Sequence, residues 1–258
     1  MGLYAKFFSM HLKSQMQYKT SFFFTIVGQF TVSFTSLLGI WFLFERFHEV
    51  EGFSFPQVLL CLATVLMSFS LAECFGRAFD QFPRMLANGE FDRVLVRPQG
   101  LIRQVLMAKI DFTRLGRVIQ AVLVFAYALP RSGVLWTWDK IFTLVLMVVS
   151  GSLVFFCLFL IYAGISFFTL EGLEFINVLT DGGREFGRYP FSIYGEEILK
   201  FLTYVVPLAL FQYYPLLYLL GREDSLRYMF APLGGLLFAL PAYALWRLGL
   251  RNYISTGS

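Results

Sequence analysis

Residues 21–44 read SFFFTIVGQFTVSFTSLLGIWFLF, a stretch without a charged side chain between Lys19 and Glu45. In an α-helix, about 20 apolar residues cross the roughly 30 Å hydrocarbon core of a bilayer, whereas buried helices of soluble proteins have shorter apolar runs of about 10–14 residues. Further uncharged stretches follow at 141–170, 201–221 and 229–246. The chain is therefore predicted to be an all-α, polytopic membrane protein.

The composition agrees with this prediction. Of the 258 residues, 57% are hydrophobic and 15% are charged, against about 25% charged in soluble domains. The length suits a single transmembrane domain over 1–258, with no room for a soluble domain of ordinary size. Cys61, Cys74 and Cys157 are dispersed among apolar residues, so no disulfide framework or metal motif is expected. The only histidines, His11 and His48, are too few for a haem or di-metal centre in the membrane.

The apolar stretches and the charges that bound them predict six spans. These lie at about 21–44, 55–76, 104–130, 141–168, 200–220 and 229–249. The first span is too long for the apolar region of a cleaved signal peptide and is expected to be retained. Residues 1–20 place apolar side chains at every fourth position and lysines opposite them, which predicts an amphipathic helix in the membrane interface.

The 21 Lys and Arg residues are distributed unevenly between the two sides of this topology. Segments on the side of the N-terminus hold 16 of them and the opposite loops hold 5. Because Lys and Arg gather on the cytoplasmic side, both termini are predicted to be cytoplasmic. The sequence pI of about 9.0 then reflects membrane orientation, and no nucleic-acid partner is expected.

Residues 171–200 are too polar to cross a bilayer alone, with six acidic and three basic side chains. We predict a helix–turn–helix on the cytoplasmic side. The alternative is an irregular re-entrant hairpin, which a membrane tolerates only where protein covers it. In that case Pro207 and Pro215 would belong to a broken helix.

Residues 79–98, FDQFPRMLANGEFDRVLVRP, connect the second and third spans. Asn88-Gly89 indicates a turn, and residues 90–96 form a short amphipathic segment in which Phe91 and Leu95 share one face. A short helix with an apolar ridge suits a groove on a soluble partner. The alternative is a solvated loop, which the many apolar side chains of this connector disfavour.

Part of this connector resembles the sequence motif of a known protein family. GEFDRVLVRP at 89–98 is similar to the G-E-F-D-x-x-L-x-R-P signature of six-span ABC-2-type permeases. RYPFSIY at 188–194, followed by Pro207 and by YYP at 213–215, resembles that family's R-Y-P-x-x-I-Y, V-x-P and Y-x-P elements in order and spacing. Gly195 stands where many members have proline. The resemblance extends over nearly the whole chain.

The resemblance implies the membrane subunit of an ATP-binding-cassette exporter in a bacterial plasma membrane. It implies two kinds of partner, an ATPase dimer and a second permease subunit. The second permease is either identical to this chain or a different ABC-2 permease, and the resemblance favours a different one. The connector would act as the coupling helix on the ATPase, a role that falls on Phe82, Met85, Glu90, Phe91, Asp92, Arg93 and Leu95. No glycine precedes a lysine in the chain, so the G-x-x-x-x-G-K-[ST] loop is missing. We therefore expect a chain that is not an enzyme and holds no cofactor, with ATP bound by the partner.

Three polar residues within the spans are candidates for a transport path: Gln29, Ser33 and Glu73. An intramembrane carboxylate is a functional candidate by default, but Arg77 follows Glu73 at i+4, the spacing of a helical ion pair. A structural ion pair is the preferred interpretation. The alternatives are a proton-coupled secondary transporter that uses Glu73, and a membrane scaffold without transport.

Overall fold

The computed structural model describes residues 3–169 and 175–253. The helices are α1 (Leu3–Gln15), η1 (Met16–Tyr18), α2 (Lys19–Arg46), α3 (Phe55–Asp80), α4 (Phe82–Ala87), α5 (Glu90–Leu95), α6 (Leu101–Ala108), η2 (Phe112–Arg114), α7 (Leu115–Ala128), η3 (Leu129–Arg131), α8 (Trp138–Thr169), α9 (Phe175–Phe186), η4 (Phe191–Tyr194), α10 (Glu196–Tyr204), α11 (Leu208–Leu219), α12 (Leu226–Leu236) and α13 (Ala239–Arg251). The strands β1 (Glu49–Val50) and β2 (Phe53–Ser54) form a small antiparallel hairpin.

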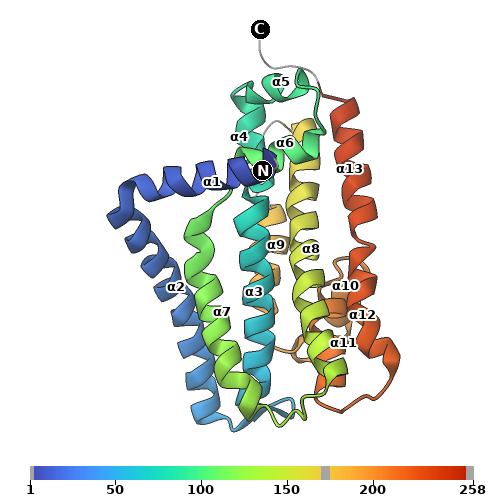
Figure 1. Cartoon of the computed structure of the whole chain (residues 1–258). Helices are drawn as coiled ribbons and strands as arrows, with labels where there is room; N and C mark the ends of the chain where they lie inside the picture. Colours follow the sequence, from blue (N-terminus) through green and yellow to red (C-terminus); the bar gives the residue numbers. More distant parts are fainter. Residues whose placement is uncertain (1–2, 170–174, 254–258) are drawn as a thin grey trace.

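The long helices run side by side as one bundle (Figure 1). Within the described residues, five helices are long and apolar enough to cross a membrane, or six if the bent pair α10–α11 counts as one span. The predicted all-α polytopic fold is confirmed. Helices α4 to α6 and the end of α13 lie at one end of the bundle, here called the connector end, and the β1–β2 hairpin lies at the other, the hairpin end (Figure 1).

Helix α1 runs crosswise to the long helices near the connector end (Figure 1). Gln15 fixes its position, because Nε2 donates to the carbonyl of Ile110 (2.5 Å) and Oε1 accepts from the amide of Phe112 (3.0 Å). The ring of Phe8 meets that of Phe112 edge-on at 4.8 Å. The structure thus has a separate N-terminal helix where one was predicted, and its location in the membrane interface stays a prediction.

The third span begins later than predicted. Helix α6 ends at Ala108, Lys109 is extended, and helix resumes only at Phe112. Asp111 explains the interruption, because its Oδ1 accepts from the amide of Thr113 (3.1 Å), as an N-cap residue does. Its own amide donates to the carbonyl of Cys74 on α3 (3.0 Å). The predicted start at 104 was therefore wrong, and α6 is a separate helix at the connector end.

The segment 175–195 does not form a helix–turn–helix outside the bundle. The end of α9 lies against the middle of α3, where the guanidinium carbon of Arg184 stands 5.0 Å from the centre of the Phe69 ring. A Cβ atom on Gly187 would come within 2.8 Å of the Val65 side chain. This part of 171–200 therefore packs within the bundle, as the re-entrant alternative requires, and the side of the membrane on which it lies stays a prediction. Residues 171–174 lie outside the described residues.

Irregular backbone inside the bundle needs hydrogen-bond partners from protein. Gln212 on α11 supplies them: its Nε2 donates to the carbonyls of Gly187 (3.2 Å) and Tyr189 (3.0 Å). The axes of α10 and α11 meet at a bend of 112°. The break between the two helices, just before Leu208, includes Pro207. The predicted fifth span at 200–220 is thus a broken helix, as the alternative proposed, and α9 leads into it.

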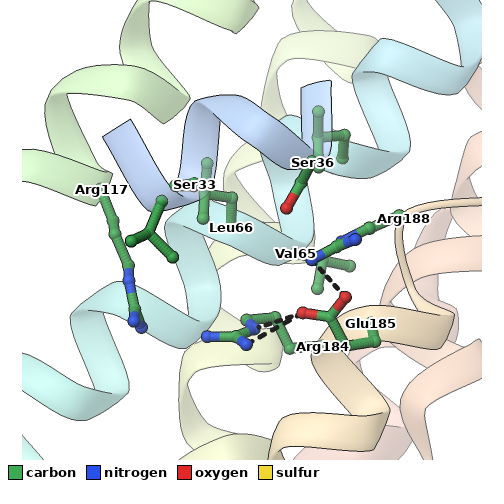
Figure 2. A pocket seen from close by; sticks show the side chains of 10 residues that line it. Ser33, Ser36, Val65, Leu66, Arg117, Arg184, Glu185 and Arg188 are labelled. Atoms are coloured by element: carbon green, nitrogen blue, oxygen red, sulfur yellow. Dashed lines mark hydrogen bonds and ion pairs between the residues drawn. The ribbon is translucent and has the colours of Figure 1, made fainter. Parts of the chain in front are cut away.

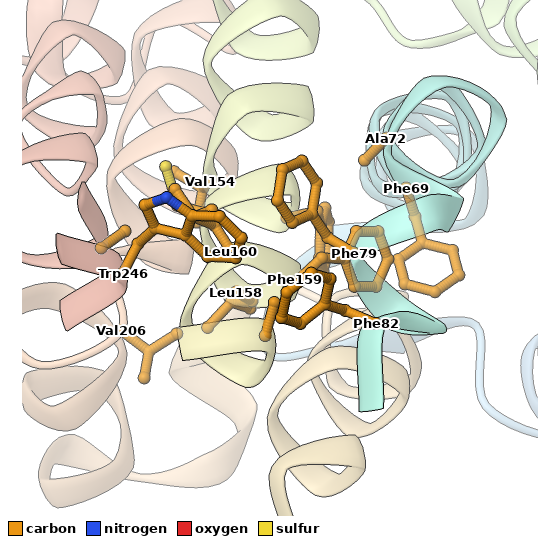
Figure 3. Packing of buried hydrophobic residues seen from close by; sticks show 14 of the residues in the cluster. Phe69, Ala72, Phe79, Phe82, Val154, Leu158, Phe159, Leu160, Val206 and Trp246 are labelled. Atoms are coloured by element: carbon orange, nitrogen blue, oxygen red, sulfur yellow. The ribbon is translucent and has the colours of Figure 1, made fainter. Parts of the chain in front are cut away.

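The core lies between α3, α8 and α13 and is rich in aromatic side chains, among them Phe69, Phe79, Phe159 and Trp246 (Figure 3). Phe79 meets Trp246 edge-on at 5.4 Å. Helices α8 and α13 cross closely because both carry glycine, and a Cβ atom on Gly249 would stand 2.5 Å from the carbonyl oxygen of Gly164. Such contacts between small residues are typical of membrane helix pairs.

Candidate functional site

The connector between α3 and α7 lies at the end of the bundle, with α5 outermost (Figure 1). The predicted Asn88-Gly89 turn is confirmed: Gly89 has φ 66° and precedes α5. This left-handed conformation favours glycine. The turn sets α4 and α5 in contact and presents one face of α5 outward and the other toward the bundle.

The inward face of α5 carries Phe91, and the prediction that Phe91 forms an exposed docking ridge with Leu95 was wrong for Phe91. Phe91 has no exposed surface, and its ring meets those of Phe82 (5.0 Å), Phe167 (5.5 Å) and Tyr253 (5.2 Å) edge-on. Phe82 is equally buried, and Met85 is partly buried against the same cluster. The apolar face of the short helix packs on the protein's own bundle because α8 and α13 end directly beneath it.

The outward face of the connector keeps the other predicted coupling residues. Glu90, Arg93 and Leu95 are exposed, as is Val96 with 83% of its surface accessible. These four residues are here called the connector rim. Asp92 lies between the two faces, where its Oδ1 accepts from the Tyr253 hydroxyl (2.9 Å).

A buried ion cluster joins α3 and α7. Glu73 is 4% exposed, and its carboxylate meets the guanidinium groups of Arg77 (3.2 Å), Arg117 (2.5 Å) and Arg114 (3.6 Å). The predicted pair between Glu73 and Arg77 is confirmed. The contacts from Arg117 on α7 and Arg114 on η2 were not predicted. Because an unpaired buried carboxylate is strongly destabilising, these arginines stabilise Glu73 and link α3 to α7.

Two further residues complete this cluster. Arg114 pairs with Asp111 at 3.3 Å, the i,i+3 contact that the spacing predicts. Its Nη1 also donates to Oε1 of Gln29 on α2 (3.2 Å). Gln29, one of the predicted path residues, therefore ties α2 to the ion cluster.

A polar cleft adjoins the ion cluster beside the middle of α2 and α3 (Figure 2). Its cavity measures about 100 Å³, and its polar lining, here called the arginine cleft, consists of Ser33, Ser36, Arg117, Arg184, Glu185 and Arg188. Glu185 pairs with Arg184 at 2.9 Å and with Arg188. The predicted path residue Ser33 lies in this cleft, whereas Gln29 and Glu73 lie in the ion cluster beside it.

A second hollow of about 460 Å³, largely open to the outside, continues from the cleft and shares Val32, Ser36 and Arg188 with it. It also borders Gly39 and Tyr189. Because Gly39 lies further along α2 toward Arg46, the two cavities together follow α2 from the middle of the bundle toward the hairpin end.

Sequence reasoning missed Arg184, Glu185 and Arg188 because it placed them outside the bundle. The available signal was Arg188 itself, which begins the RYPFSIY element that the resemblance rests on. An arginine at membrane depth is rare unless it lines a cavity or has a partner.

Comparison with known protein families identifies the family of this chain. A family profile described as ABC-2 family transporter protein matches residues 30–257, which include the connector, the arginine cleft and every residue of the ion cluster except Gln29. The chain belongs to the ABC-2 transporter family. Neither curated proteins nor solved structures give a match. As an ABC-2 permease, the chain is a multi-pass membrane component of transport and not a catalytic subunit.

Proposed function

We propose that this ABC-2 permease is the membrane subunit of an ATP-driven exporter, and that a separate ATPase dimer binds at the connector end. Family membership supports the transport role. The observation that carries the coupling role is the connector rim, whose Arg93, Leu95 and Val96 are exposed on and directly after α5, the outermost helix at the connector end (Figure 1). Arginine and apolar side chains commonly anchor protein interfaces.

Burial of Phe91 gives the connector a mechanical role in this proposal. Phe91 and Phe82 pack on Phe167 of α8 and, through the same cluster, on Trp246 of α13. A displacement of the rim by the ATPase would therefore move the ends of α3, α8 and α13 together. ATP would be bound and hydrolysed by the partner, and this chain would hold no cofactor.

The assembly would contain two permease subunits in a plasma membrane, with both termini cytoplasmic and export directed outward. The arginine cleft supports a transport path along α2. A second permease subunit, identical or different, would form the other side of this path. The rival proton-coupled transporter receives less support, because Glu73 is held by three guanidinium groups. The non-transporting scaffold has no need of a polar cleft.

Co-purification with a P-loop ATPase encoded beside this chain tests the proposal. Val96→Asp puts a charge on the connector rim and should abolish ATPase retention. Leu135→Asp is the matched control, because Leu135 is 81% exposed against 83% for Val96 but lies between η3 and α8 at the hairpin end. Equal ATPase retention in both variants would refute docking at the rim.

A further inference from the structure

The arginine cleft concentrates positive charge beside the middle of α2 and α3. Its lining has the guanidinium groups of Arg117, Arg184 and Arg188 but a single carboxylate, that of Glu185 (Figure 2). We infer that this cleft binds an anionic group, of phosphate or carboxylate chemistry, on the transported molecule. The inference rests on the proposed transport function and names the substrate class for it.

The carboxylates that neutralise these arginines are shared or turned outward. Glu185 serves both Arg184 and Arg188. The second partner of Arg184 is Asp181, at 3.5 Å, whose side chain is 60% exposed. Glu73, the partner of Arg117, is divided among three guanidinium groups.

The other charged side chains near the cleft form two ion pairs that do not face it. Arg77 pairs with Asp80 at 2.8 Å, and Arg114 pairs with Asp111 at 3.3 Å. Neither pair lines the cavity. Within the lining itself three guanidinium groups face one carboxylate, and the further partners of Arg117 and Arg184, Glu73 and Asp181, lie outside the lining. Electrostatic attraction in such surroundings is stronger than in water.

The opposite wall supplies hydroxyl groups. On α2, Thr31 and Thr35 donate to the carbonyls four residues earlier, at 2.9 and 3.2 Å. No such bond is found for Ser33 or Ser36 in the part of the chain that the structure describes, although both line the cavity. Their hydroxyls can donate to an anion across from the arginine forks, which match phosphate and carboxylate oxygens in pairs.

The dimensions agree with one anionic group that is part of a larger molecule. A cavity of about 100 Å³ exceeds the roughly 30 Å³ share of a single liquid water and suits one phosphate or carboxylate. The adjoining open hollow of about 460 Å³ provides room for the rest of the molecule along α2.

Binding to the purified full chain in phosphatidylcholine nanodiscs tests the inference. The probes are inorganic phosphate, compared with chloride at equal ionic strength, and phosphatidylglycerol added to the nanodisc. Each is followed through the thermal unfolding midpoint. Arg188→Gln should weaken binding about tenfold or more, since a charge-assisted fork is lost. Glu185→Gln should tighten it, because it removes the competing carboxylate.

The opposite signs separate a binding site from a structural ion pair, since loss of either partner of a purely structural pair would only destabilise the chain. Arg188→Lys keeps the charge without the fork and should bind with intermediate affinity if Arg188→Gln does not fold. Arg46→Gln, exposed at the far end of α2, is the control and should bind as the unchanged chain does.

Protection by phosphate would assign the site to a soluble anion, and protection by phosphatidylglycerol alone would assign it to a lipid headgroup; both support the inference. Absence of protection by either probe, or equal binding by the Arg188 and Glu185 variants, would overturn it. The ATPase takes no part in this measurement, so a chain that binds the anion but retains no ATPase would refute only the proposed function.

Discussion

The ring of Phe91 on the connector meets the ring of Tyr253, just beyond α13, edge-on at 5.2 Å. A hydrogen bond of 2.9 Å from the Tyr253 hydroxyl to Asp92 lies beside this contact. Two neighbouring residues of α5 thus bind the same residue near the end of the described chain. The connector is fastened to the bundle through its inward face, which leaves only its outward face for a partner.

Phe91→Ala should therefore destabilise the protein itself. Truncation of a buried phenylalanine costs about 3–5 kcal/mol, and the effect should appear as a lower unfolding temperature in detergent, measured without any ATPase. Val96→Ala on the same connector should change stability by no more than about 0.5 kcal/mol, because Val96 is exposed. Equal unfolding temperatures for both variants would show that the aromatic cluster does not hold the connector.

Glu73→Gln should destabilise the bundle by about 3–5 kcal/mol, because removal of one partner leaves buried charges uncompensated. Arg114 and Arg117 lose the carboxylate that joins α3 to α7. Asp80→Asn is the comparison, because Asp80 pairs with Arg77 alone among the described ion pairs, and its effect should be smaller. A Glu73→Gln chain of unchanged stability that loses pH-dependent transport would favour the proton-coupled alternative.

Gly249→Leu should disrupt the crossing of α8 and α13, since its Cβ would stand 2.5 Å from the Gly164 carbonyl oxygen. Overpacking of this kind costs about 1–3 kcal/mol or more. Gly28→Leu on α2 is the matched control, because a Cβ there meets nothing within 4 Å. It should leave stability unchanged or raise it, since leucine has the higher helix propensity. Thermal unfolding of the two variants compares them directly.

The sequence predicted the elements that hydropathy controls. The predicted spans at 21–44, 55–76 and 141–168 lie within α2, α3 and α8, because long uncharged runs leave few alternatives in a membrane. The third span was set too early because its start depends on one capping side chain, Asp111, which a hydropathy pattern does not resolve.

The site could be predicted only in part, for a related reason. A short amphipathic helix such as α5 has an apolar face, but its sequence does not specify whether that face meets its own bundle or a partner. Arg184 and Arg188 are half-buried, and their segment is held by Phe69 against Arg184 and by Val65 and Gln212 against Gly187, all distant in sequence. Contacts of this kind come from tertiary packing, so local composition suggested a helix–turn–helix on the cytoplasmic side.

The orientation of the bundle can be tested by cysteine labelling in intact cells. Glu49 and Asp224 are exposed at the hairpin end, and Asn88 is exposed at the connector end. Arg184 and Arg188 leave the cytoplasmic count because they lie inside the bundle, but that count still exceeds the opposite one, so the connector end is predicted to be cytoplasmic. Glu49→Cys and Asp224→Cys should react with a membrane-impermeant maleimide, and Asn88→Cys should not.

The native cysteines favour this experiment, because Cys61, Cys74 and Cys157 are buried and should give little background. Permeabilised cells provide the control, since Asn88→Cys should then react as the other two variants do. Labelling of Asn88→Cys in intact cells, without labelling at positions 49 and 224, would place the connector rim outside the cell. A cytoplasmic ATPase could not then reach it, and the proposed coupling at Arg93, Leu95 and Val96 would fail together with the predicted orientation.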